Sequence, residues 1–150
     1  MIGPIGIAVL CAFFAWWMST GAILVAVRLA DRRGQDTHIK IVMLAMGLLV
    51  IGLWGYRNSL TGEDISAAYI AFFSALTIWG WIELAFLSGV ITGPNRLSAP
   101  ENIAEWQRFI RAWGTVAYHE ILLFVVLLWM IYVGWGHENS VGLLTFVILY

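Results

Sequence analysis

The chain has 150 residues, of which 61% are hydrophobic and 11% charged, and its mean hydropathy is +0.86. Soluble domains carry roughly 25% charged residues, so this composition excludes an ordinary soluble protein and indicates an integral membrane protein. The net charge of −1 comes without any basic run, which gives no support for nucleic-acid binding, and the single cysteine, Cys11, excludes an internal disulfide.

Four apolar segments are each long enough, at about 20 residues, to cross the hydrocarbon core of a bilayer. They cover residues 2–27, 39–56, 66–91 and 109–134. A fifth, residues 141–150, has ten residues. Ten residues make about 15 Å of helix, which is too short for a core of about 30 Å. We therefore predict an all-α fold: a polytopic transmembrane helix bundle with four full spans plus the start of a fifth. Residues 1–150 would form a single transmembrane domain, the N-terminal part of a longer natural chain.

The basic residues are distributed unevenly between the connections. Seven of the eight fall in the first and third connections, and the remaining one is Arg57. The seven are Arg28, Arg32, Arg33, Lys40, Arg96, Arg108 and Arg111. The positive-inside rule makes their side cytoplasmic, with the N-terminus on the opposite, periplasmic side. His38 and His137 lie in connections, where we expect them to be solvated or lipid-facing.

The connection before the fourth span has a helical pattern of its own. Ser98 and Glu101 have capping-box spacing, and Pro100 is tolerated in a first turn. Apolar residues then recur at helical spacing, at Ile103, Trp106, Ile110 and Trp113. This predicts a short amphipathic interfacial helix before span four. It would be either an extension that anchors the span at the interface or a docking surface for a partner.

The third span has two faces. Ala67, Ala71 and Ala75 recur every four residues, a spacing that lets another helix approach closely. The second face is a largely aromatic stripe that includes one carboxylate, Glu83. Its residues are Tyr69, Phe72, Leu76, Trp79, Glu83 and Phe86. Such a stripe is typical of packing, but a porphyrin or carotenoid would also lie against flat side chains.

The depth of Glu83 identifies candidate partners. It lies nine residues before Thr92, about 13 Å from the end of the predicted helix, and His119 and Glu120 lie eight and nine residues beyond Arg111, about 12 to 14 Å from the same side. We therefore expect all three to meet at one level. His119 and Glu120 are adjacent and point about 100° apart, so one would pair with Glu83 and the other would face a ligand or another subunit.

Three interpretations of this cluster remain open. It is a hydrogen-bonded pair that fixes helix packing, a pigment or haem site with His119 as axial ligand of Mg or Fe, or a site of catalysis or proton transfer. The candidate cofactor-binding residues are His119, Glu83, Glu120, Trp79 and Trp81, and the cofactors considered are bacteriochlorophyll and carotenoid. No HExxH motif, repeated Glu-x-x-His pair or nucleophile triad occurs, so we predict no enzyme activity.

Four segments together suggest a family. They are WWMSTGAIL (16–24), AAYIAFFSALTIWGWIELAFLSGVITGP (67–94), WQRFIRAWGTVAYHE (106–120) and NSVGLLTFVILY (139–150). Over most of its length the chain resembles the PuhE family of photosynthetic complex assembly proteins from phototrophic bacteria, whose members are longer and have further spans. The family pattern falls on Trp81, Glu83, Gly89, Thr92, Gly93, Pro94, Trp106, Arg108, Phe109, His119 and Glu120. The family's Arg directly after TGP is displaced, since Asn95 precedes Arg96 here.

The resemblance implies a role in building the photosynthetic reaction centre and its light-harvesting antenna in the bacterial inner, cytoplasmic or intracytoplasmic, membrane. In one hypothesis the chain is a non-enzymatic assembly factor or accessory subunit that contacts reaction-centre and light-harvesting polypeptides and membrane lipids. Its partner-packing residues would be Ala67, Ala71, Ala75, Trp106 and Arg108. In the other it is a membrane enzyme or carrier for bacteriochlorophyll, carotenoid or quinone, and uses Glu83, His119 and Glu120.

Overall fold

The computed structural model describes residues 3–94 and 104–150, and every regular element in them is a helix. The helices are α1 (Pro4–Asp31), α2 (Gln35–Leu44), α3 (Met46–Ser59), α4 (Ile65–Leu87), α5 (Glu105–Gly134) and α6 (Val141–Leu149). Four helical segments are long and apolar enough to cross a membrane: Ile5–Asp31, Gln35–Ser59, Ile65–Leu87 and Glu105–Gly134. The all-α, multi-span prediction is therefore confirmed, and α6 is the expected start of a fifth apolar helix.

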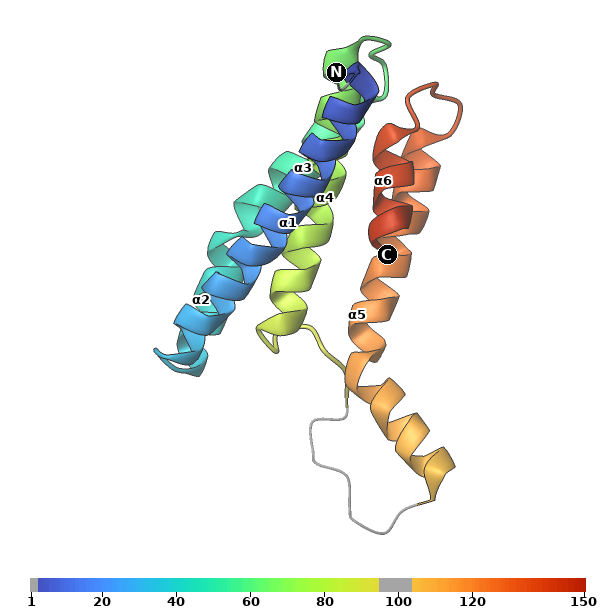
Figure 1. Cartoon of the computed structure of the whole chain (residues 1–150). Helices are drawn as coiled ribbons and strands as arrows, with labels where there is room; N and C mark the ends of the chain where they lie inside the picture. Colours follow the sequence, from blue (N-terminus) through green and yellow to red (C-terminus); the bar gives the residue numbers. More distant parts are fainter. Residues whose placement is uncertain (1–2, 95–103) are drawn as a thin grey trace.

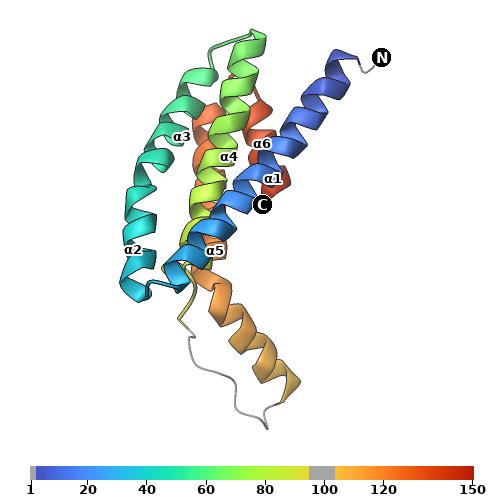
Figure 2. The same ribbon diagram turned by 60° about the vertical axis from the view of Figure 1, so that its left-hand side comes forward.

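The helices run up and down beside a central α4 (Figures 1 and 2). α2 and α3 follow each other with a single residue, Ala45, between them and together form the second span. α4 contacts every other helix, with α3 and α6 as its main neighbours. α1 covers one side of α4, whereas α5 and α6 lie on another (Figure 1). The side chains of α4 therefore form the centre of the core, and the other helices pack around them.

Glycines allow α3 to approach α4 closely. A Cβ added at Gly52 would lie 2.9 Å from Ile78 Cγ1 and 3.1 Å from the Ser74 carbonyl oxygen, and one added at Gly55 would overlap the Ser74 hydroxyl. Small residues on one helix let the backbone of the next come near, which is the main source of packing energy between helices in lipid. The close approach predicted for the third span is therefore real, and α3 provides part of it.

The alanine face needs a correction. Ala67, Ala71 and Ala75 are at most 5% exposed, so this face is covered within the chain. Opposite it, a Cβ added at Gly142 of α6 would lie 3.1 Å from the Ala71 carbonyl oxygen and 2.8 Å from the Tyr56 ring. The small residues thus admit the chain's own α6, and the face formed by Ala67, Ala71 and Ala75 is not open to a partner's helix.

Polar contacts at and just beyond the C-terminal end of α5 hold this helix to the rest of the bundle. The Tyr56 hydroxyl donates to the Met130 carbonyl at 2.8 Å, and the Asn139 side-chain amide donates to the Ser59 carbonyl at 2.8 Å. Both bonds join segments more than 70 residues apart in sequence. In an apolar surrounding no water is present to bond these polar groups, so they must bond to each other. Breaking such a bond is costly, and the two bonds therefore fix the position of α5.

The predicted end of the third span is wrong by four residues, because α4 ends at Leu87 and not at residue 91. Gly89 adopts φ 70°, the Val90 amide donates to the Ala85 carbonyl at 3.0 Å, and the Gly89 amide donates to the Phe86 carbonyl at 2.9 Å. These two bonds and the left-handed glycine make a Schellman cap. Apolar composition extends past this point, so it could not show where the helix stops.

The amphipathic segment is part of α5. Ser98, Pro100, Glu101 and Ile103 lie outside the described residues, but Trp106, Ile110 and Trp113 belong to the helix that begins at Glu105. The first turns of α5 are inclined away from the rest of it (Figure 1). Trp106 is exposed and stacks on Phe109, with ring centroids 5.6 Å apart. Among the described residues this arrangement favours the helical extension over a separate surface helix.

The two peripheral histidines differ. His137 is exposed, as expected, but His38 is buried, and its Nε2 lies 3.1 Å from Asp31 Oδ1. The expectation that His38 is solvated or lipid-facing is therefore wrong. α2 turns back against α1 after Gly34, which adopts φ 97°, and this places His38 beside the last residue of α1.

The N-terminus of α4 is capped by Asp64. Its carboxylate accepts from the Ser66 hydroxyl at 2.6 Å and from the Ala67 amide at 3.0 Å, and these bonds, the first above all, hold the pKa of Asp64 below its ordinary value. A lowered pKa means that the cap stabilises the fold above the ordinary carboxyl pKa and loses this effect as pH falls through the lowered value. We expect Asp64→Ala to lower the unfolding midpoint at about pH 7 and to make no difference well below pH 3. Unfolding in detergent at both pH values checks this.

Candidate functional site

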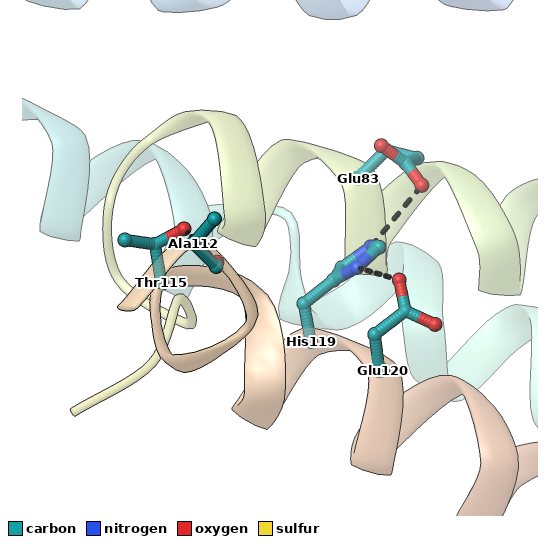
Figure 3. A network of polar contacts seen from close by, with 5 residues as sticks. All are labelled: Glu83, Ala112, Thr115, His119 and Glu120. Atoms are coloured by element: carbon teal, nitrogen blue, oxygen red, sulfur yellow. Dashed lines mark hydrogen bonds and ion pairs between the residues drawn. The ribbon is translucent and has the colours of Figure 1, made fainter. Parts of the chain in front are cut away.

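Glu83 of α4 meets His119 of α5, and Glu120 lies on the other ring nitrogen of His119 (Figure 3). His119 Nε2 lies 3.2 Å from Glu83 Oε1, and His119 Nδ1 lies 3.6 Å from Glu120 Oε1. Both ring nitrogens therefore face a carboxyl group. His119 is the residue that pairs with Glu83, and Glu120 points to another side of α5.

Burial decreases across the cluster. The side chains of His119, Glu83 and Glu120 are 8%, 21% and 45% exposed, respectively. Phe86, one turn after Glu83's position on α4, stacks on the imidazole with ring centroids 4.3 Å apart and an interplanar angle of 30°. The stack and the Glu83 contact together fix the orientation of the His119 ring.

The backbone that follows α4 also holds His119 in place. The Thr92 carbonyl accepts from the Tyr118 amide at 2.8 Å and from the His119 amide at 3.1 Å. In an unbroken α-helix these amides would donate to the carbonyls of residues 114 and 115. Thr92 therefore inserts its carbonyl into the hydrogen-bond ladder of α5, which is a recognised cause of helix bending. The first turns of α5 are inclined away from the rest of the helix (Figure 1).

Gly93 explains why the chain can pass so close to α5. A Cβ added at this residue would overlap the Gly114 carbonyl oxygen and would lie 2.8 Å from the carbonyl carbon of Thr115. Only a residue without a side chain lets the two backbones touch. The TGP motif of the sequence is thus a backbone contact that positions the cluster.

The predicted common level is confirmed, but the predicted depth is not. Since α4 ends at Leu87, Glu83 lies four residues from the helix end, or about 6 Å, and not about 13 Å. On α5, His119 lies five residues, or about 7 Å of helix, after Gly114, whose carbonyl the TGP segment approaches. The cluster therefore lies near the end of the bundle where α4 stops.

The hydrogen bond of the cluster joins two helices. Each imidazole nitrogen can donate or accept according to the tautomer, and the bond that the structure shows runs between His119 Nε2 and Glu83 Oε1. Because Glu83 belongs to α4 and His119 to α5, this bond locks the two helices together.

The tryptophans and the interfacial residues do not join this cluster. Trp81 points toward α2, where its indole N–H donates to the Val42 carbonyl at 3.2 Å. Trp79 lies one turn before Glu83 and is part of the buried apolar core. Trp106 and Arg108 lie in the first turn of α5, more than two turns before His119. The candidate cofactor residues are therefore divided between separate parts of the bundle.

The cluster does not offer a ready metal site in the part of the chain that the structure describes. No group of three or more His, Cys, Asp and Glu side chains there has a metal-binding arrangement. A single axial ligand needs a ring nitrogen that faces open space, but both nitrogens of His119 face carboxyl groups. In this conformation the residues do not fit an axial ligand, and ligation by Nε2 would require Glu83 to move away.

The sequence placed Thr92 and Gly93 in the family pattern, but sequence reasoning did not predict their part in the site. The Thr92 carbonyl and Gly93 act through the backbone, which a search for titratable side chains does not consider. The signal was present, because a Thr-Gly-Pro sequence directly after an apolar helix indicates a specific turn.

Comparisons with known proteins identify the family of the chain and a relative. Residues 2–150 match the family described as "Protein of unknown function (DUF3623)". The chain is 43% identical over 141 residues to the "Uncharacterized 30.4 kDa protein in puhA 5'region" of Rhodobacter capsulatus, an alignment that covers 94% of this chain and 52% of the relative. The chain thus spans about half the length of that relative. No solved structure matches the chain.

Proposed function

We propose that this chain, which belongs to the DUF3623 family, is a non-enzymatic integral membrane assembly factor or accessory subunit of the bacterial photosynthetic reaction centre and light-harvesting complex. The observation that carries the proposal is the relative in Rhodobacter capsulatus, whose name places it beside puhA, a photosynthesis gene. The resemblance to photosynthetic complex assembly proteins points the same way.

The surface of the bundle supports a role in helix packing. α1 exposes a run of large apolar side chains that includes Phe13, Phe14, Trp16 and Trp17, and α5 exposes Phe124 and Leu128 among others. These faces need an apolar covering, which acyl chains or the helices of a membrane complex provide. In this proposal, the helices that cover these faces belong to reaction-centre and light-harvesting polypeptides.

The proposed location is the bacterial inner membrane, cytoplasmic or intracytoplasmic. The basic residues cluster in sequence around the α1–α2 connection and before the apolar part of α5, and the positive-inside rule makes that side cytoplasmic. The N-terminus is then periplasmic. The inclined first turns of α5, with exposed Trp106 and Trp113, lie at the cytoplasmic lipid interface in this orientation.

One observation favours a second candidate function. A buried imidazole between two carboxyl groups is suited to proton transfer or to hydrogen bonding with a polar group on an apolar molecule. The alternative is therefore a membrane enzyme or carrier that handles bacteriochlorophyll, carotenoid or quinone through Glu83, His119 and Glu120.

Deletion of the gene in a phototrophic host, followed by complementation, separates the two functions. We expect the deletion to lower the yield of the reaction-centre and light-harvesting complex while the pigment precursors keep their normal profile. Complementation with Glu83→Gln should restore much of the yield, since glutamine still hydrogen-bonds to His119. A pigment precursor that accumulates in the deletion strain and in the His119→Ala strain would instead establish the enzyme or carrier.

A further inference from the structure

The exposed face of α1 contains an apolar hollow. A shallow cavity of about 460 Å³ lies around Gly21, and Trp17, Leu24 and Val25 are among the residues that line it. These three side chains are exposed. Nothing lies within 4 Å of a Cβ added at Gly21, so the hollow exists because large side chains surround a residue that has none. We call this cavity the α1 hollow.

Two arginines lie on the same face of α1 as the hollow. Arg28 and Arg32 follow Leu24 at intervals of four residues, and Arg32, the C-cap residue, still has helical backbone angles. Gly21 and Trp17 lie seven and eleven residues before Arg28, which is close to two and three whole turns. The hollow and the two guanidinium groups therefore follow one line along the helix.

The cations at this end of α1 have no counter-ion in the described chain. Four exposed basic side chains form no ion pair or hydrogen bond within residues 3–94 and 104–150. They are Arg28, Arg32, Arg33 and Lys40. Two carboxylates lie in the same stretch, but that of Asp31 contacts His38 Nε2 at 3.1 Å, and Asp36 is the other. Four cations against two carboxylates leave this region positive with His38 neutral.

The distance from the arginines to the hollow matches one leaflet of a bilayer. Gly21 lies about 10 Å along the helix from Arg28, and Trp17 about 16 Å. One leaflet contributes about 15 Å of the hydrocarbon core. An acyl chain that begins at the level of Arg28 therefore passes through the α1 hollow before it reaches the centre of the bilayer.

An anionic phospholipid has both groups that this face requires. Its phosphate accepts charge-assisted hydrogen bonds from guanidinium groups, and basic residues at the end of a membrane helix attract lipids with a net negative charge. Its acyl chain fills the apolar hollow. An apolar protein segment in the hollow would leave the arginines without an anion, whereas the surrounding bilayer offers phosphate and acyl chain in one molecule.

We propose that α1 binds one anionic phospholipid, with the phosphate between Arg28 and Arg32 and an acyl chain in the α1 hollow. Arg33 and Lys40 add positive charge nearby, which favours a lipid with a net negative charge over a zwitterionic one. The inference goes beyond the proposed function and does not depend on it, because a lipid site of this kind serves an assembly factor and a carrier equally.

Native mass spectrometry of the purified full-length natural protein tests the headgroup contact. The protein is released from mixed micelles that contain phosphatidylglycerol and phosphatidylcholine with identical acyl chains in equal amounts. We expect it to retain phosphatidylglycerol in preference, and Arg28→Gln to lower the affinity for this lipid roughly fivefold. Arg57→Gln removes the same charge from an exposed position in the last turn of α3, so the preference should remain in this control.

Gly21→Leu tests the acyl-chain contact separately. The leucine fills the hollow, so the retention of both lipids should fall, while the preference for phosphatidylglycerol remains because the arginines are unchanged. Gly47→Leu is the matched control, since nothing lies within 4 Å of a Cβ at that helical glycine either. Both substitutions replace glycine by a better helix former, so unfolding midpoints at or above the wild-type value show that both variants fold.

Three results would overturn the inference. They are equal affinity of the wild-type protein for the two lipids, equal effects of Arg28→Gln and Arg57→Gln, and equal retention in Gly21→Leu and Gly47→Leu. A natural protein that retains no lipid shows that the remainder of its own chain covers the hollow, which also contradicts the inference. None of these results changes the yield of the photosynthetic complex in the deletion strain, so the proposed function is tested independently.

Discussion

Replacing His119 with alanine is expected to lower the free energy of unfolding by about 3 kcal/mol. The substitution removes the ring that is stacked on Phe86 and leaves Glu83, with a side chain 21% exposed, without the imidazole. A carboxyl group left without its partner in an apolar surrounding costs more than the bond itself contributed, and the lost ring leaves a cavity. Unfolding of the purified natural protein in mixed detergent micelles measures the loss.

The neighbouring carboxyl groups supply matched controls for His119→Ala. Glu120→Gln should cost less than about 1 kcal/mol, because no hydrogen bond to Glu120 exists within the described chain. Glu83→Gln should fall between the two, since the amide can still bond to the ring. Equal losses for His119→Ala and Glu120→Gln would show that the Glu83–His119 pair does not hold α4 to α5.

Gly93→Val is expected to destabilise the protein by about 3 kcal/mol and to weaken the link between α4 and α5. The new side chain would overlap the Gly114 carbonyl, so the segment after α4 must move away from α5. The Thr92 carbonyl would then move away from the Tyr118 and His119 amides. Hydrogen exchange should show faster exchange at these two amides.

Gly47→Ala is the control for this substitution. Nothing lies within 4 Å of a Cβ at Gly47, which is inside α3, so alanine there should stabilise the helix by up to about 1 kcal/mol. A Gly93→Val protein as stable as Gly47→Ala would contradict the close contact between the TGP segment and α5.

Composition was sufficient to predict the spans, because a bilayer demands long apolar helices whatever their neighbours are. It could not predict the end of α4, since Val90 and Ile91 are as apolar as the helix before them. The αL conformation of Gly89 decides that boundary, and a glycine in a membrane helix is common enough that its position alone does not reveal the cap. The sequence also could not predict which helix packs against each face of α4. The spacing of Ala71 and Ala75 indicated close approach but not that α6 would provide it.

The Glu83–His119 pair was predictable because ionisable side chains within a membrane span are costly to leave without a polar partner. Two such side chains at the same level of neighbouring helices are therefore expected to pair. The separation of Trp81 from this pair follows from helix geometry, since residues two apart point to nearly opposite sides. The roles of Thr92 and Gly93 depend on backbone atoms, whose positions a sequence does not state. Glu120 shows how far the prediction went: adjacency to His119 placed it on another side of α5, and its exposure there is what the structure adds.

The most direct test of the proposed assembly function is a gentle detergent purification of the tagged natural protein from phototrophic membranes, with polypeptides and absorption spectrum recorded in the same fractions. We predict that reaction-centre and light-harvesting polypeptides accompany the wild-type protein in a constant ratio. A protein that elutes alone but coloured would contradict this function and favour the pigment carrier or enzyme. A protein that elutes alone and colourless would contradict both functions and leave the Glu83–His119 pair a structural lock between α4 and α5.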